Sequence, residues 1–112
     1  MIRTSIPRRR SKPRRGVLVN PRYLIFIHTR RCLLSMREDT RCSGMLNAHH
    51  VRPSRDPRND ERTVPLCEGH HLQAFGPDAI HRLGQKRWQE KFDVDLEAEI
   101  LWLQSEFERW KQ

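Results

Sequence analysis

The spacing of hydrophobic and polar positions along the chain predicts a first short helix over residues 21–30. Within this segment Leu24, Ile27 and His28 fall on one helical face. Asn20 stands immediately before the segment and is a favourable N-cap, because its side chain can accept a hydrogen bond from a free backbone amide. His28 is expected to be a polar surface residue of this helix rather than a metal ligand.

Two short strands are predicted in the middle of the chain. Residues 45–51 form the first strand and residues 63–66 the second. A polar loop over residues 53–61 separates them and contains turn-forming residues. Pro65 lacks a backbone N–H, so the second strand is expected at a sheet edge or in an irregular ladder.

Helices are predicted again beyond the second strand. The expected segments are 67–75, 77–83, 85–92 and a last helix that begins after Asp95 as its N-cap. Apolar positions of the last helix recur every three or four residues: Leu96, Ile100, Leu103, Phe107 and Trp110. Core packing is the preferred interpretation of this stripe, and a dimer seam is the alternative. Two strands among several helices predict a small α+β fold.

Charge is distributed unevenly along the 112 residues, whose net charge is +8. Residues 1–16 carry seven Arg or Lys residues and no acid, which predicts a disordered basic arm. Residues 17–112 are expected to form one domain. Its C-terminal end is acidic and is not expected to contact nucleic acid. The basic arm and middle suit a polyphosphate such as DNA, and the absence of acids favours an electrostatic arm over the alternative of a solubilising tail.

The composition also predicts a compartment. Hydrophobic residues make up 36% of the chain and charged residues 32%, which indicates a thin core that a structural metal could supplement. No apolar run is long enough for a signal peptide or a membrane span, so no membrane partner is expected. Three cysteines suit a disulfide framework poorly. A reducing cytoplasm is therefore expected.

The cysteines and one histidine predict a structural zinc site. Cys67 and His70 have the spacing of a metal knuckle, with two residues between them. Cys32 and Cys42 would supply the other two ligands of a tetrahedral site with three sulfurs and one nitrogen. Three buried or unrelated thiols are the alternative.

The other histidines predict a second, catalytic metal site. Neighbouring side chains on a strand point to opposite faces, so His49 and His50 are expected to differ in role. One would bind metal and the other would act as a general base on water. On the following helix His71 would face the strands while His70 turns to the cysteines. His81 is the available third ligand.

These residues resemble a known family. The motifs are Ala48-His49-His50-Val51-Arg52, Val64-Pro65-Leu66-Cys67-x2-His70-His71 and His81-Arg82-Leu83-Gly84 with Trp88. They look like the HNH, or His-Me finger, endonucleases of phage and prophage genomes, and most closely the RecA-dependent group typified by Ref. The resemblance covers about residues 20–105. It implies a ββα-metal core, with two strands and a helix around one divalent ion.

The resemblance also implies roles for individual residues. His50 would be the general base, and the metal ligands would be His49, His71 and His81. The sequence departs from the family pattern at Arg62, which stands where the middle Asn of the HNH signature usually lies. Asn59 and Asp60 lie close by and are candidates to brace the loop.

A further candidate lies just beyond the predicted base. Arg52 is a candidate phosphate clamp because of this position, and a solvated charge at the strand end is the alternative. The histidine ligands favour Zn²⁺, Mn²⁺, Ni²⁺ or Co²⁺ at the catalytic site, and Mg²⁺ could act when phosphate oxygens complete its coordination.

The resulting hypothesis is a metal-dependent DNA endonuclease or nickase that leaves 5′-phosphate and 3′-hydroxyl ends. A recombinase filament such as RecA is an additional partner that the resemblance suggests. Two alternatives belong to other classes. One is a non-catalytic, zinc-stabilised DNA-binding module, and the other is an interaction protein that uses its C-terminal helix.

Overall fold

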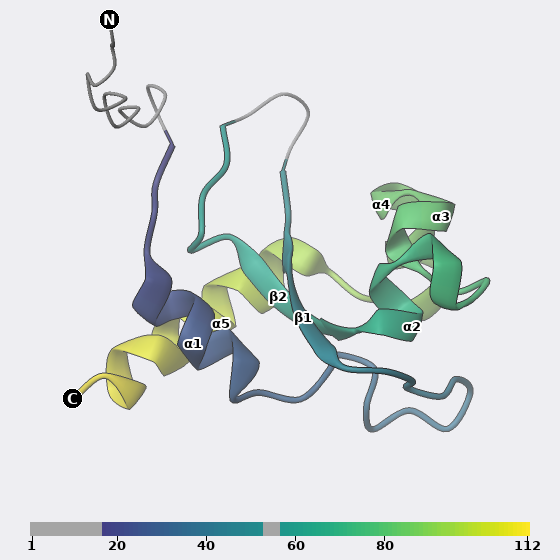
Figure 1. Ribbon diagram of the computed structural model, residues 1–112, viewed down its shortest axis with the longest axis horizontal. Coiled ribbons are helices and arrows are strands. Elements are labelled where there is room, and N and C mark those ends of the chain that lie inside the picture. The colour runs from purple at the N-terminus through teal and green to yellow at the C-terminus, as the bar shows by residue number, and fades with distance from the viewer. Residues whose placement is uncertain (1–16, 53–56) are drawn as a thin grey trace, which may run out of the picture.

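The computed structural model describes residues 17–52 and 57–112, so the predicted arm over 1–16 lies outside the described residues. The fold is α+β, with a two-stranded antiparallel sheet among helices (Figure 1). The elements in chain order are α1 (Pro21–His28), β1 (Leu46–His50), β2 (Thr63–Cys67), α2 (Glu68–His71), a 3-10 turn (Gln73–Phe75), α3 (Ile80–Leu83), α4 (Gln85–Phe92) and α5 (Leu96–Trp110). Within the described residues, no helix has the length and apolar character that a membrane crossing requires.

The two strands pair in a register that places His49 opposite Val64 and His50 opposite Thr63. Every residue of β2 is buried, because β1, α1, α2 and α5 all pack against it. The Pro65 carbonyl on β2 accepts a hydrogen bond from the Leu33 amide at 3.0 Å. On this side Pro65 therefore faces a loop instead of another strand. This position suits proline, because it has no N–H to donate to a neighbouring strand.

α1 begins as the sequence predicts, because the Asn20 side chain accepts a hydrogen bond from the Tyr23 amide at 3.1 Å. His28 is exposed, which confirms the expectation that it is a surface residue. On the predicted apolar face Ile27 is buried but Leu24 is only half-buried, and Tyr23 and Phe26 are buried instead. α1 packs against aromatic residues of α5. This contact buries the aromatic side chains of α1, which the spacing of apolar residues within α1 alone does not predict.

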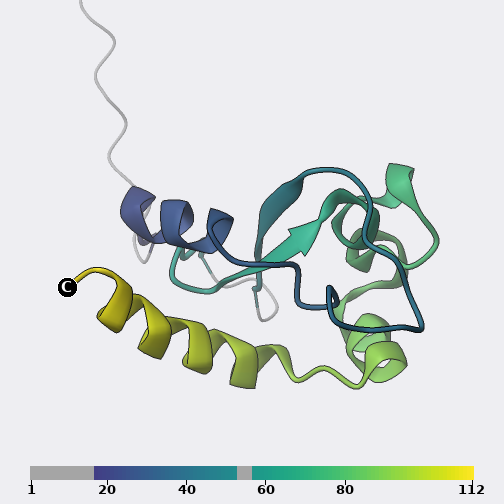
Figure 2. The ribbon, with the colours of Figure 1, turned by 90° about the horizontal axis from the view of Figure 1, so that it is seen from below.

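α5 carries the longest apolar stripe and supports the predicted interpretation as core. Asp95 caps it by accepting a hydrogen bond from the Ala98 amide at 3.2 Å. Figure 2 shows α5 running along one side of the molecule next to α1, while α2, α3 and α4 gather towards the other end. The buried residues of the stripe are Leu96, Ile100, Leu103 and Phe107. Trp110 ends the stripe and is partly exposed while its ring stacks on Phe107.

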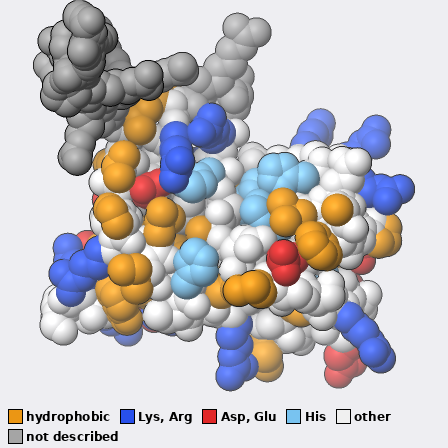
Figure 3. All heavy atoms as spheres, in the orientation of Figure 1, with side chains coloured by type: hydrophobic (Ala, Val, Ile, Leu, Met, Phe, Trp, Pro, Cys, Tyr) orange, Lys and Arg blue, Asp and Glu red, His pale blue; other side chains and the backbone are white. Residues whose placement is uncertain are grey.

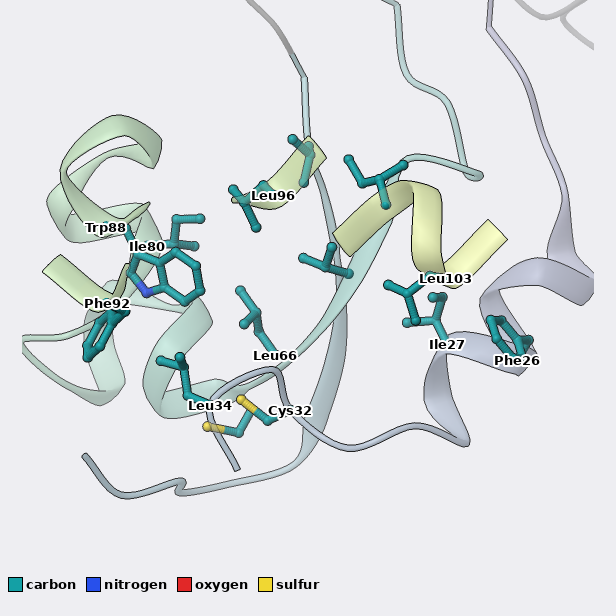
Figure 4. Close-up of a cluster of buried hydrophobic side chains, with 14 of the residues drawn as sticks. Phe26, Ile27, Cys32, Leu34, Leu66, Ile80, Trp88, Phe92, Leu96 and Leu103 are labelled. Carbon is teal, nitrogen blue, oxygen red and sulfur yellow. The ribbon is translucent and has the colours of Figure 1, made fainter. Parts of the chain in front are cut away.

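The hydrophobic core extends from the α1–α5 contact across β2 to α4. Figure 4 shows this cluster, with Trp88 and Phe92 of α4 at one end and Phe26 of α1 at the other. Cys32 lies at its edge beside Leu34. The core therefore reaches the predicted zinc ligands directly.

The segment between β2 and α4 differs from its prediction. The helix expected over 67–75 ends at His71, because Leu72 adopts an extended conformation and residues 73–75 form an exposed 3-10 turn. Because residues 73–75 are exposed, they have no core to pack an apolar helix face against, and packing does not stabilise a longer helix there. The helix expected over 77–83 is shortened to Ile80–Leu83. Gly84, with a φ of 88°, then separates α3 from α4.

Candidate functional site

Two clusters of potential metal ligands meet at the end of the sheet next to α2. In each cluster the ligand atoms lie within 4.8 Å of one another. The first cluster, called the sulfur cluster, consists of Cys32, Cys42, Cys67 and His70. The second cluster, called the histidine cluster, consists of His49, His71 and His81. The tertiary structure thus brings together both ligand sets that the sequence predicts.

The sulfur cluster has the dimensions of a tetrahedral zinc site. His70 Nδ1 lies 3.0 Å from the sulfur of Cys67, 3.7 Å from that of Cys32 and 3.9 Å from that of Cys42. Ligands held at ordinary zinc bond lengths in a tetrahedron would be about 3.5 Å apart. All three cysteines are free thiols, so no disulfide competes for them. The cluster could hold a metal ion such as zinc.

A chain of hydrogen bonds holds His70 on the side of its ring that faces away from the sulfurs. His70 directs Nδ1 at the sulfurs, and its Nε2 lies 2.7 Å from the hydroxyl oxygen of Thr40. Thr40 donates to Asp78 at 3.2 Å, and Asp78 also pairs with Lys91 at 2.5 Å. Such outer contacts hold a ligating imidazole in one orientation and one tautomer.

Gly69 lies between the two knuckle residues for a steric reason. A Cβ at Gly69 would approach the Ser43 hydroxyl oxygen to 2.2 Å. The Gly69 amide donates to the Ser43 carbonyl at 3.0 Å. The missing side chain therefore allows the loop that carries Cys42 to close over α2.

Two thiols of this cluster, those of Cys32 and Cys42, are hard to ionise without a cation. Burial raises the pKa of Cys42 to about 12, and neighbouring thiols add to that increase. Burial likewise raises the pKa of Cys32, while it lowers the pKa of His70. A divalent ion would reverse the effect on the thiols by stabilising the thiolates.

The three histidines of the second cluster come from β1, α2 and α3. Their ring centroids lie 5.1 Å apart for His49 and His71, 5.3 Å for His49 and His81, and 4.8 Å for His71 and His81. His81 is the predicted ligand furthest along the chain. The break between α2 and α3 lets the chain turn back, so that His81 lies next to His49 and His71.

Two observations show that this cluster suits a metal ion. His49 is buried, and its Nε2 has no hydrogen-bond partner among the described residues. A buried nitrogen left without a partner is costly, and a metal ion would satisfy it. His71 Nδ1 contacts the Asn47 side-chain oxygen at 2.9 Å, so this nitrogen carries the proton and Nε2 keeps its lone pair.

Burial keeps the imidazoles of His49 and His71 neutral, which is the state that binds metals. Burial, followed by the nearby histidines, lowers the pKa of His49 to about 3. The same causes lower the pKa of His71 to about 4. Both side chains are therefore available as ligands over the whole neutral range.

His50 follows His49 on β1 but is held by a different partner. Its Nε2 lies 2.8 Å from Asp60 Oδ1, and Asp60 is 1% exposed. Burial alone would raise the pKa of Asp60, but hydrogen bonds from His50, the Asn20 amide and Arg58 outweigh it and lower this pKa. Arg58 Nε lies 3.2 Å from both His50 Nε2 and Asp60 Oδ1. An ionised carboxylate can only accept hydrogen bonds, so in the neutral imidazole of His50 the proton lies on Nε2, and Arg58 donates to the carboxylate.

Asp60 is itself fixed by distant parts of the chain. Its second oxygen accepts a hydrogen bond from the Asn20 amide at 2.9 Å. Its backbone amide donates to the Leu18 carbonyl at 3.0 Å, and Arg58 Nε donates to Oδ1 at 3.2 Å. The sequence identified Asp60 as a loop brace and missed its direct contact with His50. Asn59, the other predicted brace, instead accepts a hydrogen bond from the Glu61 amide.

The second cluster opens into a pocket of about 380 Å³. Its lining residues are Ala48, His49, His50, Arg52, His71, His81 and Gln85. Figure 3 shows histidine side chains exposed on this face, with Lys and Arg side chains at its borders. Predicted ligands, the predicted base and Arg52 thus share one cavity. Sequence analysis missed Gln85, which had no signal beyond its position after Gly84.

Comparisons with protein-family models, curated proteins and solved structures gave no match for this chain. The function is therefore inferred from the geometry of the site and from the motifs in its sequence.

Proposed function

We propose that this protein is a metal-dependent DNA endonuclease or nickase of the HNH type. The observation that carries the proposal is the pocket that brings three converging histidines next to a histidine bound to an aspartate. Phosphodiester hydrolysis needs a site for a divalent ion and a base for water within one cavity. The strand–strand–helix order of β1, β2 and α2 agrees with the ββα-metal core that the motifs suggest.

The ligands of the catalytic ion would be His49, His71 and His81. When bound, a divalent ion supplies stabilisation of the negative charge that develops on the phosphate and on the leaving oxygen. Arg52 at the rim of the pocket would bind a phosphate oxygen through its guanidinium group.

His50 would accept the proton from the attacking water. Asp60 holds its Nε2–H, so Nδ1 is the nitrogen available as a base. Asp60 also stabilises the imidazolium that forms when His50 takes the proton. The water oxygen then bonds to phosphorus as the bond to the 3′ oxygen breaks, which leaves 5′-phosphate and 3′-hydroxyl ends.

A nicking assay on supercoiled plasmid with Mg²⁺, Mn²⁺, Zn²⁺, Ni²⁺ or Co²⁺ tests this function. His50→Ala should reduce the rate by roughly 10²–10⁴, the usual contribution of a positioned base. Metal content and DNA affinity should stay close to wild type. His28→Ala is the matched control, because His28 is an exposed histidine on α1 away from the pocket.

Ligand variants separate the two roles within the site. His49→Ala and His71→Ala should lose catalytic metal, and higher metal concentrations should partly restore their activity. If wild-type protein binds DNA but leaves every plasmid intact with all five metals, the chain is a zinc-stabilised DNA-binding module instead. Undiminished cleavage by His50→Ala would remove the proposed base.

A further inference from the structure

A second pocket lies between α5 and the segment that follows α1. Its volume is about 390 Å³, which falls within the usual range of ligand pockets. One wall is formed by residues between Thr29 and Met36, and the other by Trp102 and Leu103 of α5, with Pro65 of β2 between them in the lining. This pocket shares no lining residue with the histidine pocket. A ligand bound here would therefore contact a different part of the molecule.

Large apolar side chains at this second pocket are exposed. Trp102 is 54% exposed and Met36 is 80% exposed, although both line the pocket. Trp, Met and Arg side chains are enriched where proteins bind one another, because a partner that covers them buries much apolar area. The apolar part of this surface therefore indicates a partner with large apolar side chains.

The charged side chains of the same pocket are basic. Arg30 and Arg31 line it, and the described lining contains no Asp or Glu. Arg30 is already held, because its guanidinium lies 4.6 Å from the centre of the Phe26 ring and 3.8 Å from the Glu106 carboxylate. Arg31 is exposed, and among the described residues its guanidinium contacts the sulfur of Met36 at 3.7 Å and forms no ion pair. Arg31 can therefore bind a carboxylate of a partner through charge-assisted hydrogen bonds.

The charges on α5 favour a peptide over a nucleic acid as this partner. Glu99 stands three residues before Trp102 and Glu106 four residues after it, so both flank Trp102 on the helix surface. A nucleic acid carries a negative charge on every nucleotide, and a strand that stacked on Trp102 would approach these carboxylates. A peptide can instead place one carboxylate at Arg31 and an apolar side chain on Trp102.

We propose that this second pocket binds a peptide segment of a partner protein, in which a large apolar residue lies next to an Asp or Glu. The apolar side chain would pack on Trp102 and Leu103, and the carboxylate would bind Arg31. The inference is independent of the proposed function, because no residue of the histidine pocket takes part.

Selection of a displayed library of random dodecapeptides on the full chain tests this inference. Enriched sequences should contain a large apolar residue beside Asp or Glu. An enriched peptide is then labelled with fluorescein, and its binding is measured by anisotropy. Arg31→Glu and Trp102→Ala should each weaken binding by roughly tenfold. Replacing the acidic residue of the peptide by its amide should weaken binding to wild type by a similar factor, but not binding to Arg31→Glu.

Two variants are matched controls. Arg87→Glu makes the same charge change at an exposed position of α4, and Leu101→Ala removes an exposed apolar side chain of α5. Neither residue lines the pocket, so both variants should bind the peptide as wild type does.

The indole N–H signals in NMR spectra locate the bound peptide. The Trp102 signal should shift when the peptide is added. Trp88 is the internal reference, because it is buried and its Nε1 donates to the Asp78 carbonyl at 3.1 Å.

The outcomes that would overturn the inference are equally defined. They are a selection that enriches no peptide, enriched sequences without an acidic residue, and peptide binding that Arg31→Glu or Trp102→Ala leaves unchanged. If a thymidine oligonucleotide shifts the Trp102 signal and Arg31→Glu abolishes that shift, the pocket binds nucleic acid instead. If Trp102→Ala converts a dimer into a monomer in sedimentation experiments, the pocket is covered by a second copy of the chain instead.

Discussion

His49 and His50 are neighbours in sequence, yet their surroundings assign them different chemistry. His49 is buried beside His71 and His81, and within the part of the chain that the structure describes its Nε2 has no hydrogen-bond partner. His50 is held by the carboxylate of Asp60. The alternation of side chains along β1 begins this separation, and the partners of each ring complete it. At the scale of single residues, Asp60 is therefore the position whose change should be most informative.

We predict that Asp60→Asn impairs cleavage by roughly 10²–10⁴ without removing metal. An asparagine amide can donate to His50 Nε2, which would move the proton to Nδ1 and leave the wrong nitrogen facing water. The measurement is plasmid cleavage together with elemental analysis. Asp93→Asn is the control, since Asp93 is exposed and its left-handed backbone tolerates Asn. Equal cleavage by both variants would show that Asp60 does not position the base.

The same substitution should change the pH dependence of stability. The folded state lowers the pKa of Asp60, so its carboxylate contributes stability above the unfolded pKa and this contribution is lost as pH falls through the folded pKa. At neutral pH, Asp60→Asn should reduce the free energy of unfolding by roughly 1–3 kcal/mol. The difference from wild type should shrink below about pH 4. Urea titrations at several pH values measure it, and a constant difference would contradict the prediction.

At the scale of elements, the sulfur cluster connects parts of the chain that have little stability alone. α2 and α3 have four residues each, and helices of that length are not stable in isolation. The cluster joins the loop of Cys32 and Cys42 to the end of β2 and to His70 on α2. His71, a member of the second cluster, follows His70 directly in sequence, so the two clusters share α2.

We predict zinc in the protein as purified, bound by Cys32, Cys42, Cys67 and His70. Removing it by chelation, or changing Cys67 to Ser, should unfold much of the domain, because metal-binding energy contributes directly to folding. Elemental analysis, thiol titration and circular dichroism measure these effects, and restoration of helical signal on adding zinc is the control. A folded protein without zinc, whose thiols all titrate freely, would refute the assignment.

At the scale of the whole molecule, charge separates the two ends of the chain. Seven basic residues precede Gly16, while α5 carries most of the acids of the C-terminal end. The pocket with its histidines is lined by residues of β1, α2, α3 and α4 together with Arg52. The segment Leu18–Asn20, directly after the basic residues, is hydrogen-bonded to Arg58 and Asp60.

We predict that deleting residues 1–15 weakens DNA binding but retains catalysis. These residues carry charge and contain no candidate ligand or base. Fewer counterions would be released on binding, so affinity should depend less steeply on salt concentration. Fluorescence anisotropy with a labelled duplex at several salt concentrations measures the slope. An unchanged slope would show that the arm does not contact DNA.

Local patterns in the sequence were sufficient for several features of this protein. The cap and buried stripe of α5 and the strand that carries His49 and His50 were predicted correctly in position. The side chains predicted as two ligand sets do lie together in two clusters. Each depends on the spacing of residues close in sequence, or on the small number of cysteines and histidines that can serve as ligands.

Tertiary structure decided the features that depend on distant residues. The buried face of α1 follows from the aromatic rings of α5, and the end of α2 at His71 follows from the exposure of residues 73–75. The partner of His50 is fixed by a contact between Asn20 and Asp60, which are 40 residues apart. No periodic pattern records such a contact, because it forms only when the folded chain brings both residues to the same buried place.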